Sequence, residues 1–261
     1  MSKNLYKLFY KDYFSQVSFS YIFDGNSISR KHIEEANQTF IEIKNHDLLE
    51  ASLSVIPSCK RANAQVPLKI EYPGLITGLG IGHEANIEGE FKLGIHLDFT
   101  YGMPVIYGSS VKGILRAAFN DPEYIKALLG REVDVEDLIK DIFDGQERDL
   151  EKENATENKK IYKNKSIYKR DVFFDAVIIS PDSKERILSS DYITPHLNPL
   201  RDPLPICFVK IASGCTIEFR FRVVSSVLPN SEKLALFLRI LCDSGVGAKT
   251  HVGYGQLSET D

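Results

Sequence analysis

The chain has 261 residues, of which 43% are hydrophobic and 26% are charged, as in ordinary globular proteins. Its 32 Lys and Arg against 36 Asp and Glu do not indicate a free-standing basic nucleic-acid binder, although a local basic patch remains compatible with RNA. The sequence shows no long apolar run and no signal peptide, so we expect no membrane span. Its four cysteines are scattered without a Cys-x-x-Cys pair, so we expect neither a zinc site nor a disulfide framework. This use of cysteine suits a reducing cytoplasm.

The first part of the chain is predicted to contain mostly extended structure and one helix. Residues 1–30 are rich in Tyr and Phe without a clear period, which predicts an irregular extension or a short strand. A helix is predicted from residue 29 to about residue 49, followed by extended structure over residues 60–73. Residues 74–84 contain four glycines, whose backbone can approach a ligand closely. Residues 90–106 are predicted to form two short strands.

The stretch that begins at Gly108 is predicted to form a two-faced helix, with Ser109 or Ser110 as its N-cap. An apolar stripe recurs at helical spacing: Val111, Ile114, Leu115, Ala118 and Phe119. The opposite face combines hydroxyl groups, two cations and a glycine: Ser109, Lys112, Gly113 and Arg116. The missing side chain between the two cations would let an anionic polymer such as RNA approach the backbone. The alternative is an ordinary solvated face, on which exposed charge is the norm.

Two more helices are predicted over residues 122–129 and 134–143. Residues 146–170 are rich in Glu, Lys and Asn and are expected to form a flexible charged insertion. Its second half interleaves basic and tyrosine side chains: Lys159, Lys160, Tyr162, Lys163, Lys165, Tyr168, Lys169 and Arg170. In one interpretation the cations follow a phosphate backbone while the tyrosine rings stack on bases. The alternative is a flexible loop that faces solvent.

The following part of the chain is predicted to contain strands, a loop and a helix. A strand over residues 172–179 is interrupted by Asp175, whose carboxylate is expected to be paired or to face solvent. A proline-rich loop is predicted over residues 191–205, and a hairpin over residues 206–224. The helix predicted over residues 231–243 is expected to bury one apolar stripe: Leu234, Phe237, Leu238 and Leu241.

A second glycine-rich loop lies near the C-terminus. Its glycines allow successive backbone amides to form an anion-binding concavity, while Lys249 and His251 add charge or donors and Tyr254 offers a ring to a base. The loop is not a nucleotide P-loop, because Ala248 separates Gly247 from Lys249 and the predicted order is helix, loop, strand. The alternative is a glycine-rich turn between a helix and the last strand.

Dispersed motifs between about residue 74 and residue 256 carry a resemblance to a known family: Gly78-Leu79-Gly80 with His83-Glu84, Thr100-Tyr101-Gly102-Met103-Pro104-Val105-Ile106, Gly108-Ser109-Ser110-Val111-Lys112-Gly113, Phe173-Phe174-Asp175-Ala176 and Thr194-Pro195-His196. Together with the C-terminal loop, these motifs resemble the RAMP superfamily of CRISPR-associated RNA-binding proteins. More narrowly, the chain is similar to the family of sixth subunits of the Cmr (type III-B) effector complex.

This resemblance implies an α+β fold, with a ferredoxin-like (RRM/RAMP) core and helical and loop insertions in a single domain. An N-terminal extension is expected over about residues 1–60 and a flexible charged insertion over about residues 146–170. The resemblance implies a non-catalytic subunit, without metal or cofactor, that binds guide (CRISPR) RNA beside the backbone subunits of a Cmr complex in antiviral defence. RNA contact is expected from the two-faced helix and the C-terminal loop: Ser109, Ser110, Lys112, Arg116, Gly245, Gly247, Lys249, His251, Gly253 and Tyr254.

Two other hypotheses remain open. One is a metal-independent endoribonuclease of the guide-processing RAMP kind, with His83 or His251 as general acid/base and a lysine that steadies the phosphate. The other is a structural protein whose glycine loops bind neighbouring chains. Specific cleavage of repeat RNA by the purified chain would favour the first, and a lack of RNA crosslinks inside an assembly would favour the second.

Overall fold

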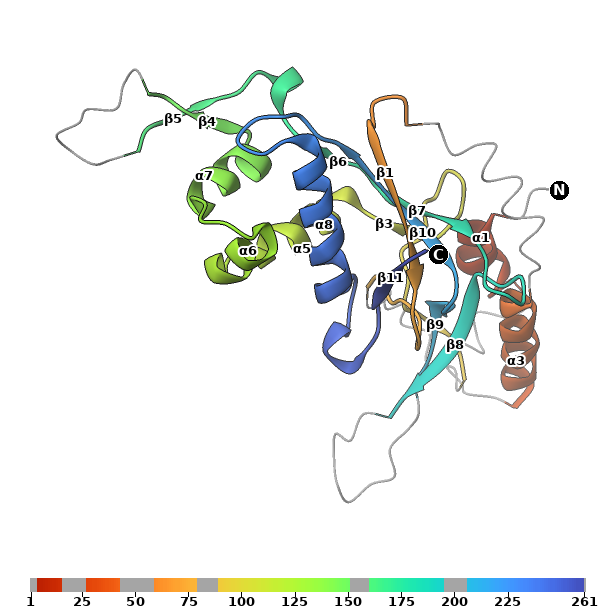
Figure 1. Ribbon diagram of the computed structural model, residues 1–261. Helices are drawn as coiled ribbons and strands as arrows, with labels where there is room; N and C mark the ends of the chain where they lie inside the picture. Colours follow the sequence, from red (N-terminus) through yellow and green to blue (C-terminus); the bar gives the residue numbers. More distant parts are fainter. Residues whose placement is uncertain are drawn as a thin grey trace.

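The computed structural model (Figure 1) describes residues 4–15, 27–42, 59–78, 89–150, 160–194 and 206–260. Its centre is strand β10 (Thr216–Arg222), in which Ile217, Phe219 and Phe221 are buried and the residues between them are half-buried. This alternation is the one that the sequence predicts, because successive side chains of a strand point to opposite faces.

The main sheet has six strands and places the C-terminal strand at one edge. Its order is β11-β1-β10-β7-β3, and the short strand β6 also pairs with β10. All these pairings are antiparallel. The remaining strands of this sheet are β1 (Ala64–Ile70), β3 (Val105–Ile106), β6 (Val172–Phe173), β7 (Ala176–Ser180) and β11 (Leu257–Glu259). The break between β6 and β7 falls at Asp175, as predicted.

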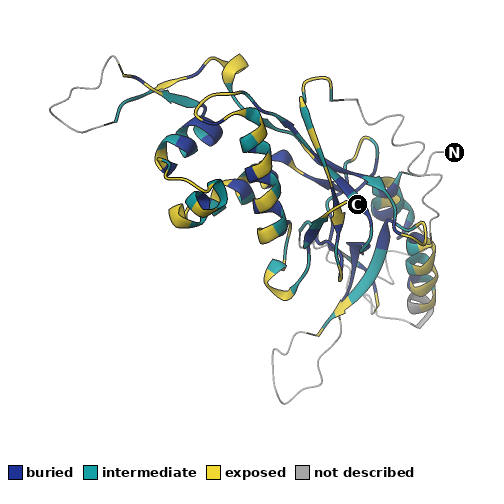
Figure 2. Cartoon of the chain, in the orientation of Figure 1, coloured by how far each residue is buried: buried dark blue, intermediate teal, exposed yellow. Residues whose placement is uncertain are grey.

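A layer of helices packs beside this sheet. It contains α5 (Gly108–Ala118), α6 (Pro122–Leu129), α7 (Val135–Ile139) with the π-helical turn η2 (Lys140–Asp144), and α8 (Asn230–Ser244). The predicted boundaries of α6 and α7 agree with the structure, because local chemistry fixes them. Asp121 accepts a hydrogen bond from the N–H of Tyr124, and Gly145 ends η2 in the left-handed conformation. Figure 2 shows the buried residues of these helices on their inner sides.

The predicted hairpin over residues 206–224 is wrong. Strand β9 (Ile206–Ile211) pairs with β8 (Leu188–Ile193) and, in parallel, with β2 (Lys92–Leu93), forming a second sheet, whereas β10 belongs to the main sheet. The turn at Gly214 therefore carries the chain from one sheet to the other. The N–H and C=O of Ile211 instead bond to Leu75. Strand β8 also extends through Ile193, so the first residues of the predicted proline-rich loop are strand, and residues 195–205 lie outside the described part.

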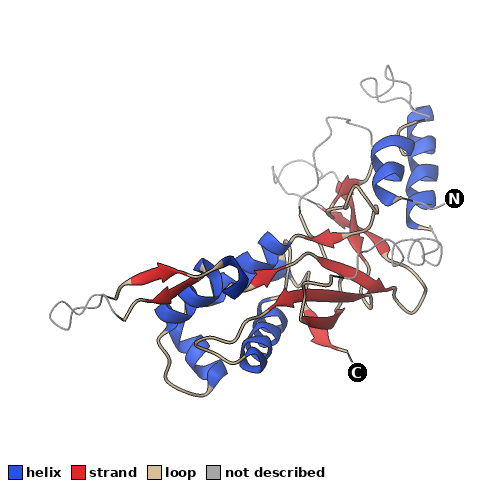
Figure 3. Cartoon of the chain, turned by 90° about the horizontal axis from the view of Figure 1, so that it is seen from above, coloured by secondary structure: helices blue, strands red, loops and turns tan. Residues whose placement is uncertain are grey.

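The N-terminal segment is helical, contrary to the irregular extension or strand that we predict from its sequence. Helix α1 (Leu5–Lys7) continues into the π-helical turn η1 (Leu8–Asp12). Leu5, Phe9 and Tyr13 recur every four residues and are buried in the same core as the sheets. Helix α3 (Ser27–Ile41) also packs here, and residues 43–49 of the longer helix predicted there are not described. Figure 3 shows these helices at the opposite end of the molecule from strands β4 and β5.

The segment expected to be a flexible insertion is ordered at both ends. Strands β4 (Gln146–Arg148) and β5 (Tyr162–Asn164) pair as an antiparallel ribbon, followed by the 3-10 turn η3 (Ile167–Lys169). Three of its lysines have carboxylate partners: Lys160 with Asp134 and Glu136, Lys163 with Glu147, and Lys165 with Asp141. The partners of Lys160 and Lys165 connect this segment to α7 and η2, and three of the six cations in the predicted basic track are paired with carboxylates. Residues 151–159 are not described.

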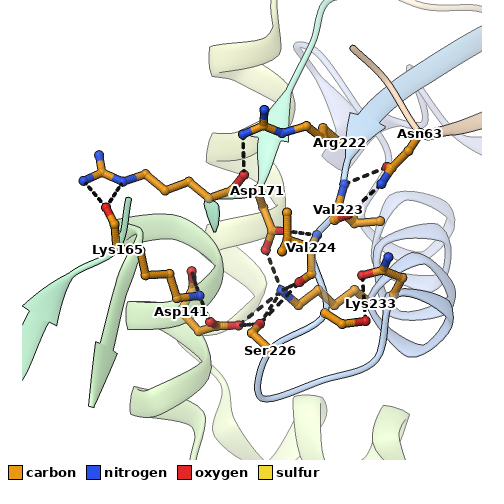
Figure 4. A network of polar contacts seen from close by, with 12 residues as sticks. Asn63, Asp141, Lys165, Asp171, Arg222, Val223, Val224, Ser226 and Lys233 are labelled. Atoms are coloured by element: carbon orange, nitrogen blue, oxygen red, sulfur yellow. Dashed lines mark hydrogen bonds and ion pairs between the residues drawn. The ribbon is translucent and has the colours of Figure 1, made fainter. Parts of the chain in front are cut away.

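The buried face of α8 differs from the predicted stripe by including a lysine. The buried positions are Lys233, Leu236, Phe237, Ile240 and Leu241, while Leu234 and Leu238 are only half-buried. Lys233 has an exposed fraction of 0% and lies in a polar network with Asp141, Asp171 and Ser226 (Figure 4).

All four cysteines are free. None of the helices in the described ranges has the length and apolar character needed to cross a membrane.

Candidate nucleic-acid interface

The C-terminal glycine loop connects α8 to β11 and is held against the first glycine-rich segment. The N–H of Ala248 bonds to the carbonyl of Ile76 at 2.7 Å, and the N–H of Gly255 bonds to the carbonyl of Gly74 at 2.8 Å. Gly247 has φ +86°, and a Cβ there would lie 2.1 Å from the Ile76 oxygen. Glycine is therefore required at this position for conformation and for space. Residues 74–78 and residues 245–255 therefore form one packed unit, which we call the glycine-rich unit.

Two of the predicted loop contacts lie on the surface of this unit. Lys249 is exposed, adopts φ +61°, and directly precedes the short 3-10 turn η4 (Thr250–Val252), which carries the exposed His251. Neither side chain makes an ion pair with another residue of the described part of the chain. Both can therefore meet an anionic ligand without first breaking an ion pair within the described residues.

Tyr254 is held by the protein, unlike the free stacking ring that we expect from the sequence. Its hydroxyl donates to Asp191 Oδ2 at 2.8 Å, and Lys210 Nζ lies 5.4 Å from its ring centroid. Its ring also makes an edge contact with Phe208. Burial and the bond to Asp191 raise the pKa of Tyr254 to about 12. Tyr254 thus anchors the glycine loop to strands β8 and β9.

The anchor at Asp191 is expected to weaken in acid. Burial by itself would raise the pKa of Asp191, but the Lys210 ammonium and the Tyr254 hydroxyl outweigh it and hold this pKa below its ordinary value. A carboxyl with a lowered pKa contributes stability above its unfolded pKa of about 4, and this contribution is lost as the pH falls through the folded value. Thermal melts from pH 7 to pH 3 should therefore show a smaller acid-dependent loss for Asp191→Asn than for the wild type. The exposed Glu185→Gln should behave as wild type, and equal losses in all three proteins would contradict this role.

At the start of α5, neither predicted serine is the N-cap. Tyr107 occupies that position without a side-chain cap, and Ser109 and Ser110 lie exposed in the first turn. The cap comes instead from the neighbouring strand connection, where Asp175 Oδ1 accepts a bond of 2.7 Å from the Gly108 N–H. This agrees with the expectation that the Asp175 carboxylate is paired. A Cβ on Gly108 would lie 2.2 Å from the Phe173 oxygen, so the sequence places glycine where the helix meets the sheet.

The outer face of α5 is partly available to a ligand. Gly113 is exposed with no atom within 4 Å of a built Cβ, and Lys112 is half-buried without an ion pair in the described residues. Arg116 is already engaged, because its Nη1 lies 2.5 Å from Asp144 Oδ1 and its guanidinium lies 6.0 Å from the Phe143 ring. Burial of Asp144 acts to raise its pKa, but Arg116 and Lys140 outweigh this effect and lower it. Arg116 therefore has a structural partner that the sequence alone does not reveal.

His96, which is not among the predicted site residues, connects the glycine-rich unit to α5. Its backbone N–H donates to Thr77 Oγ1, and its ring packs on the Tyr107 ring with centroids 5.2 Å apart. A Cβ on Gly78 would lie 2.7 Å from His96 Nε2, and burial lowers the pKa of this histidine. A chain of contacts therefore links the C-terminal glycine loop to the start of α5. It runs from Gly247 through residues 76–78 and His96 to Tyr107. His83 lies outside the described residues.

Comparison with known proteins identifies the family. A family model described as the RAMP superfamily matches residues 67–258, which is well over half of the chain. The chain belongs to the RAMP superfamily. The match to this RAMP chain begins in β1 and ends in β11, so it includes both glycine-rich segments and α5.

Two relatives extend this finding. The CRISPR system Cmr subunit Cmr6 of Pyrococcus furiosus is 33% identical to this RAMP chain over 34% of the chain and 30% of that protein. The chain thus matches less than a third of that relative's length. A chain in the structure described as "Cryo-EM structure of the Type III-B Cmr-beta bound to cognate target RNA" has a TM-score of 0.58 and 20% identity, covering 90% of this chain and 72% of that one. The second match shows similarity of fold. The resemblance expected from the motifs is confirmed.

Proposed function

We propose that this RAMP chain is a subunit of a type III-B Cmr effector complex, where it contacts the guide RNA beside the backbone subunits, in the cytoplasm. The similarity to Cmr6 and the fold similarity to a chain of a Cmr complex bound to target RNA support the assembly. The observation that carries RNA contact is the packed glycine-rich unit, which presents Lys249 and His251 without internal ion pairs within the described residues. Lys112 and the exposed Gly113 on α5 supply the second contact region.

We also propose a ferredoxin-like core. Strands β1, β7, β10 and β11 with helices α5 and α8 follow one another in the chain as β-α-β-β-α-β, which is the ferredoxin-like succession. The sheet order β11-β1-β10-β7 with antiparallel neighbours supports this reading. The second sheet and the β4–β5 ribbon are then insertions between its elements.

A non-catalytic role is part of the proposal. A general acid/base needs a positioned partner and a reachable proton. Within the described residues, the exposed His251 has no hydrogen-bonded side-chain partner that would orient it. Purified protein incubated with repeat RNA is therefore expected to produce no specific cleavage. Specific products that disappear in His251→Ala or His83→Ala would overturn this part of the proposal in favour of an endoribonuclease.

RNA contact predicts a specific salt dependence. The double variant Lys112→Ala/Lys249→Ala, assembled into the complex, should release guide RNA at lower salt than the wild type. Each lost phosphate contact should reduce the slope of log affinity against log salt by about 0.7, as for single-stranded nucleic acids. The measurement is filter retention of labelled guide RNA by the assembled complex over a salt series.

The matched control replaces two exposed lysines elsewhere, Lys31→Ala/Lys184→Ala, and thereby changes the net charge equally. It should leave both affinity and slope unchanged. Equal behaviour of the two double variants would count against phosphate contacts at Lys112 and Lys249 and would favour an interaction surface for neighbouring proteins.

A further inference from the structure

Tyr72 is the most exposed large hydrophobic or aromatic side chain in the described part of the chain, with an exposed fraction of 84%. It lies in the turn after β1, two residues before Gly74, the first glycine of the glycine-rich unit. Single exposed rings are common on protein surfaces, so the position of this ring is informative only together with its rigid support and its neighbours. The described part of the chain leaves most of this ring exposed.

The backbone around Tyr72 is fixed. The N–H of Gly74 bonds to the Glu71 carbonyl at 2.8 Å, and the N–H of Glu71 bonds to the Gln256 carbonyl at 2.9 Å. Gly74 has φ +115°, and a Cβ there would lie 2.4 Å from the Ile211 oxygen. The turn is therefore clamped between β11 and β9, and the ring projects from a rigid support. A rigid aromatic loses little conformational entropy when it binds a ligand.

The surroundings of Tyr72 favour an anionic, aromatic ligand. A Cβ on Gly253 would lie 3.7 Å from Pro73 Cδ, so the Tyr72 turn borders the loop that carries Lys249 and His251. Tyr72 also contributes to the raised pKa of Tyr254, which agrees with their proximity. Tyr254 itself is committed to Asp191 and Lys210. An aromatic ring beside a lysine without an ion pair in the described residues is the arrangement with which proteins stack bases and hold phosphates of single-stranded RNA.

We infer that Tyr72 is the base-stacking residue of the glycine-rich unit, where its ring packs on one unpaired guide-RNA base while Lys249 contacts the adjoining phosphate. The inference rests on the proposed function. It assigns to Tyr72 the stacking role that the sequence alone suggests for Tyr254. It also explains why Tyr254 contributes a hydroxyl anchor rather than a free ring.

The test uses the assembled complex with guide RNA that carries 5-iodouridine at successive positions along its length. Irradiation should crosslink one position to Tyr72, as located by mass spectrometry. Tyr72→Ala should abolish this crosslink and speed guide release about 5- to 100-fold, in line with the usual value of one stacked base. Tyr72→Phe should retain both properties because its ring remains. The control Phe99→Ala removes another ring, 75% exposed, that lies beside Asp98 rather than beside lysines, and it should change neither property.

The other outcomes separate this inference from the proposed function. Crosslinks to residues 247–253 with none at Tyr72, and normal release from Tyr72→Ala, would overturn the stacking role and leave RNA contact intact. No crosslink to this chain at any position would overturn both. Loss of the chain from the complex in Tyr72→Ala, without an RNA crosslink, would assign Tyr72 to a protein neighbour and also refute stacking.

Discussion

Lys233→Met is expected to lower the free energy of unfolding by about 3–5 kcal/mol, the usual cost of removing one partner from a buried ion pair. The Lys233 Nζ lies 2.7 Å from Asp171 Oδ2 and 3.2 Å from Asp141 Oδ2. It also donates to the Val224 carbonyl and to the Ser226 hydroxyl, each at 2.8 Å. Lys233 and both carboxylates have exposed fractions of at most 2%. Methionine is an unbranched side chain only one heavy atom shorter, so the loss is mainly one of charge and hydrogen bonds.

Asp171 is the carboxylate that depends most on Lys233, because Lys165 also pairs with Asp141 (Figure 4). Burial raises the pKa of Asp171 even with Lys233 present. Without Lys233 this pKa should rise further, and a raised folded pKa makes stability fall as the pH rises. The loss of unfolding free energy in Lys233→Met relative to wild type should therefore be largest near pH 7 and smaller near pH 5.

Urea denaturation followed by circular dichroism at both pH values measures this deficit. Lys233→Met/Asp171→Asn removes the unpaired charge and should recover part of the loss, whereas the exposed Lys184→Met should change stability by less than about 0.5 kcal/mol. If Lys233→Met were as stable as Lys184→Met at pH 7, the contacts of Lys233 with Asp141 and Asp171 would not stabilise the fold.

Gly247→Ala is expected to disrupt the candidate RNA interface. Its φ of +86° is strained for alanine, and the new Cβ would meet the Ile76 carbonyl oxygen at 2.1 Å. The strain alone costs about 1–3 kcal/mol, and separation of the two segments would also break the Ala248 N–H bond to Ile76. We expect a lower melting temperature and weaker retention of guide RNA by the assembled complex, measured by calorimetry and by filter binding.

Gly113→Ala is the matched substitution. Gly113 is exposed in α5 with nothing within 4 Å of the new Cβ, so alanine should stabilise the protein by about 0.5–1 kcal/mol. If RNA approaches the α5 backbone there, this variant should nevertheless retain guide RNA less well. A more stable Gly113→Ala protein with unchanged retention would remove this face of α5 from the interface. Unchanged stability of Gly247→Ala would contradict the packing of the loop on residue 76.

Much of the local structure follows from the sequence. Three features depend only on residues close together in the chain: the alternation in β10, the Asp121 cap of α6 and the glycine that ends η2. A short stretch of sequence is therefore enough to predict each of them. The two glycine-rich segments are also evident from sequence, because glycine marks places of close backbone approach. The helical spacing of Leu5, Phe9 and Tyr13 was present too, but it is obscured by the other aromatic residues around it.

Only the tertiary structure decides which distant groups meet. The turn after β9 looks like a hairpin turn, yet the hydrogen bonds of Ile211 go to Leu75 and send β9 and β10 into different sheets. Asp175 caps α5 from another strand, and Asp191 holds the Tyr254 hydroxyl from 63 residues away. Lys233 is buried because two carboxylates from elsewhere in the chain neutralise it. Periodicity and turn chemistry are properties of neighbouring residues, whereas a buried charge, a remote cap or an exposed ring such as Tyr72 depends on what the fold places against it.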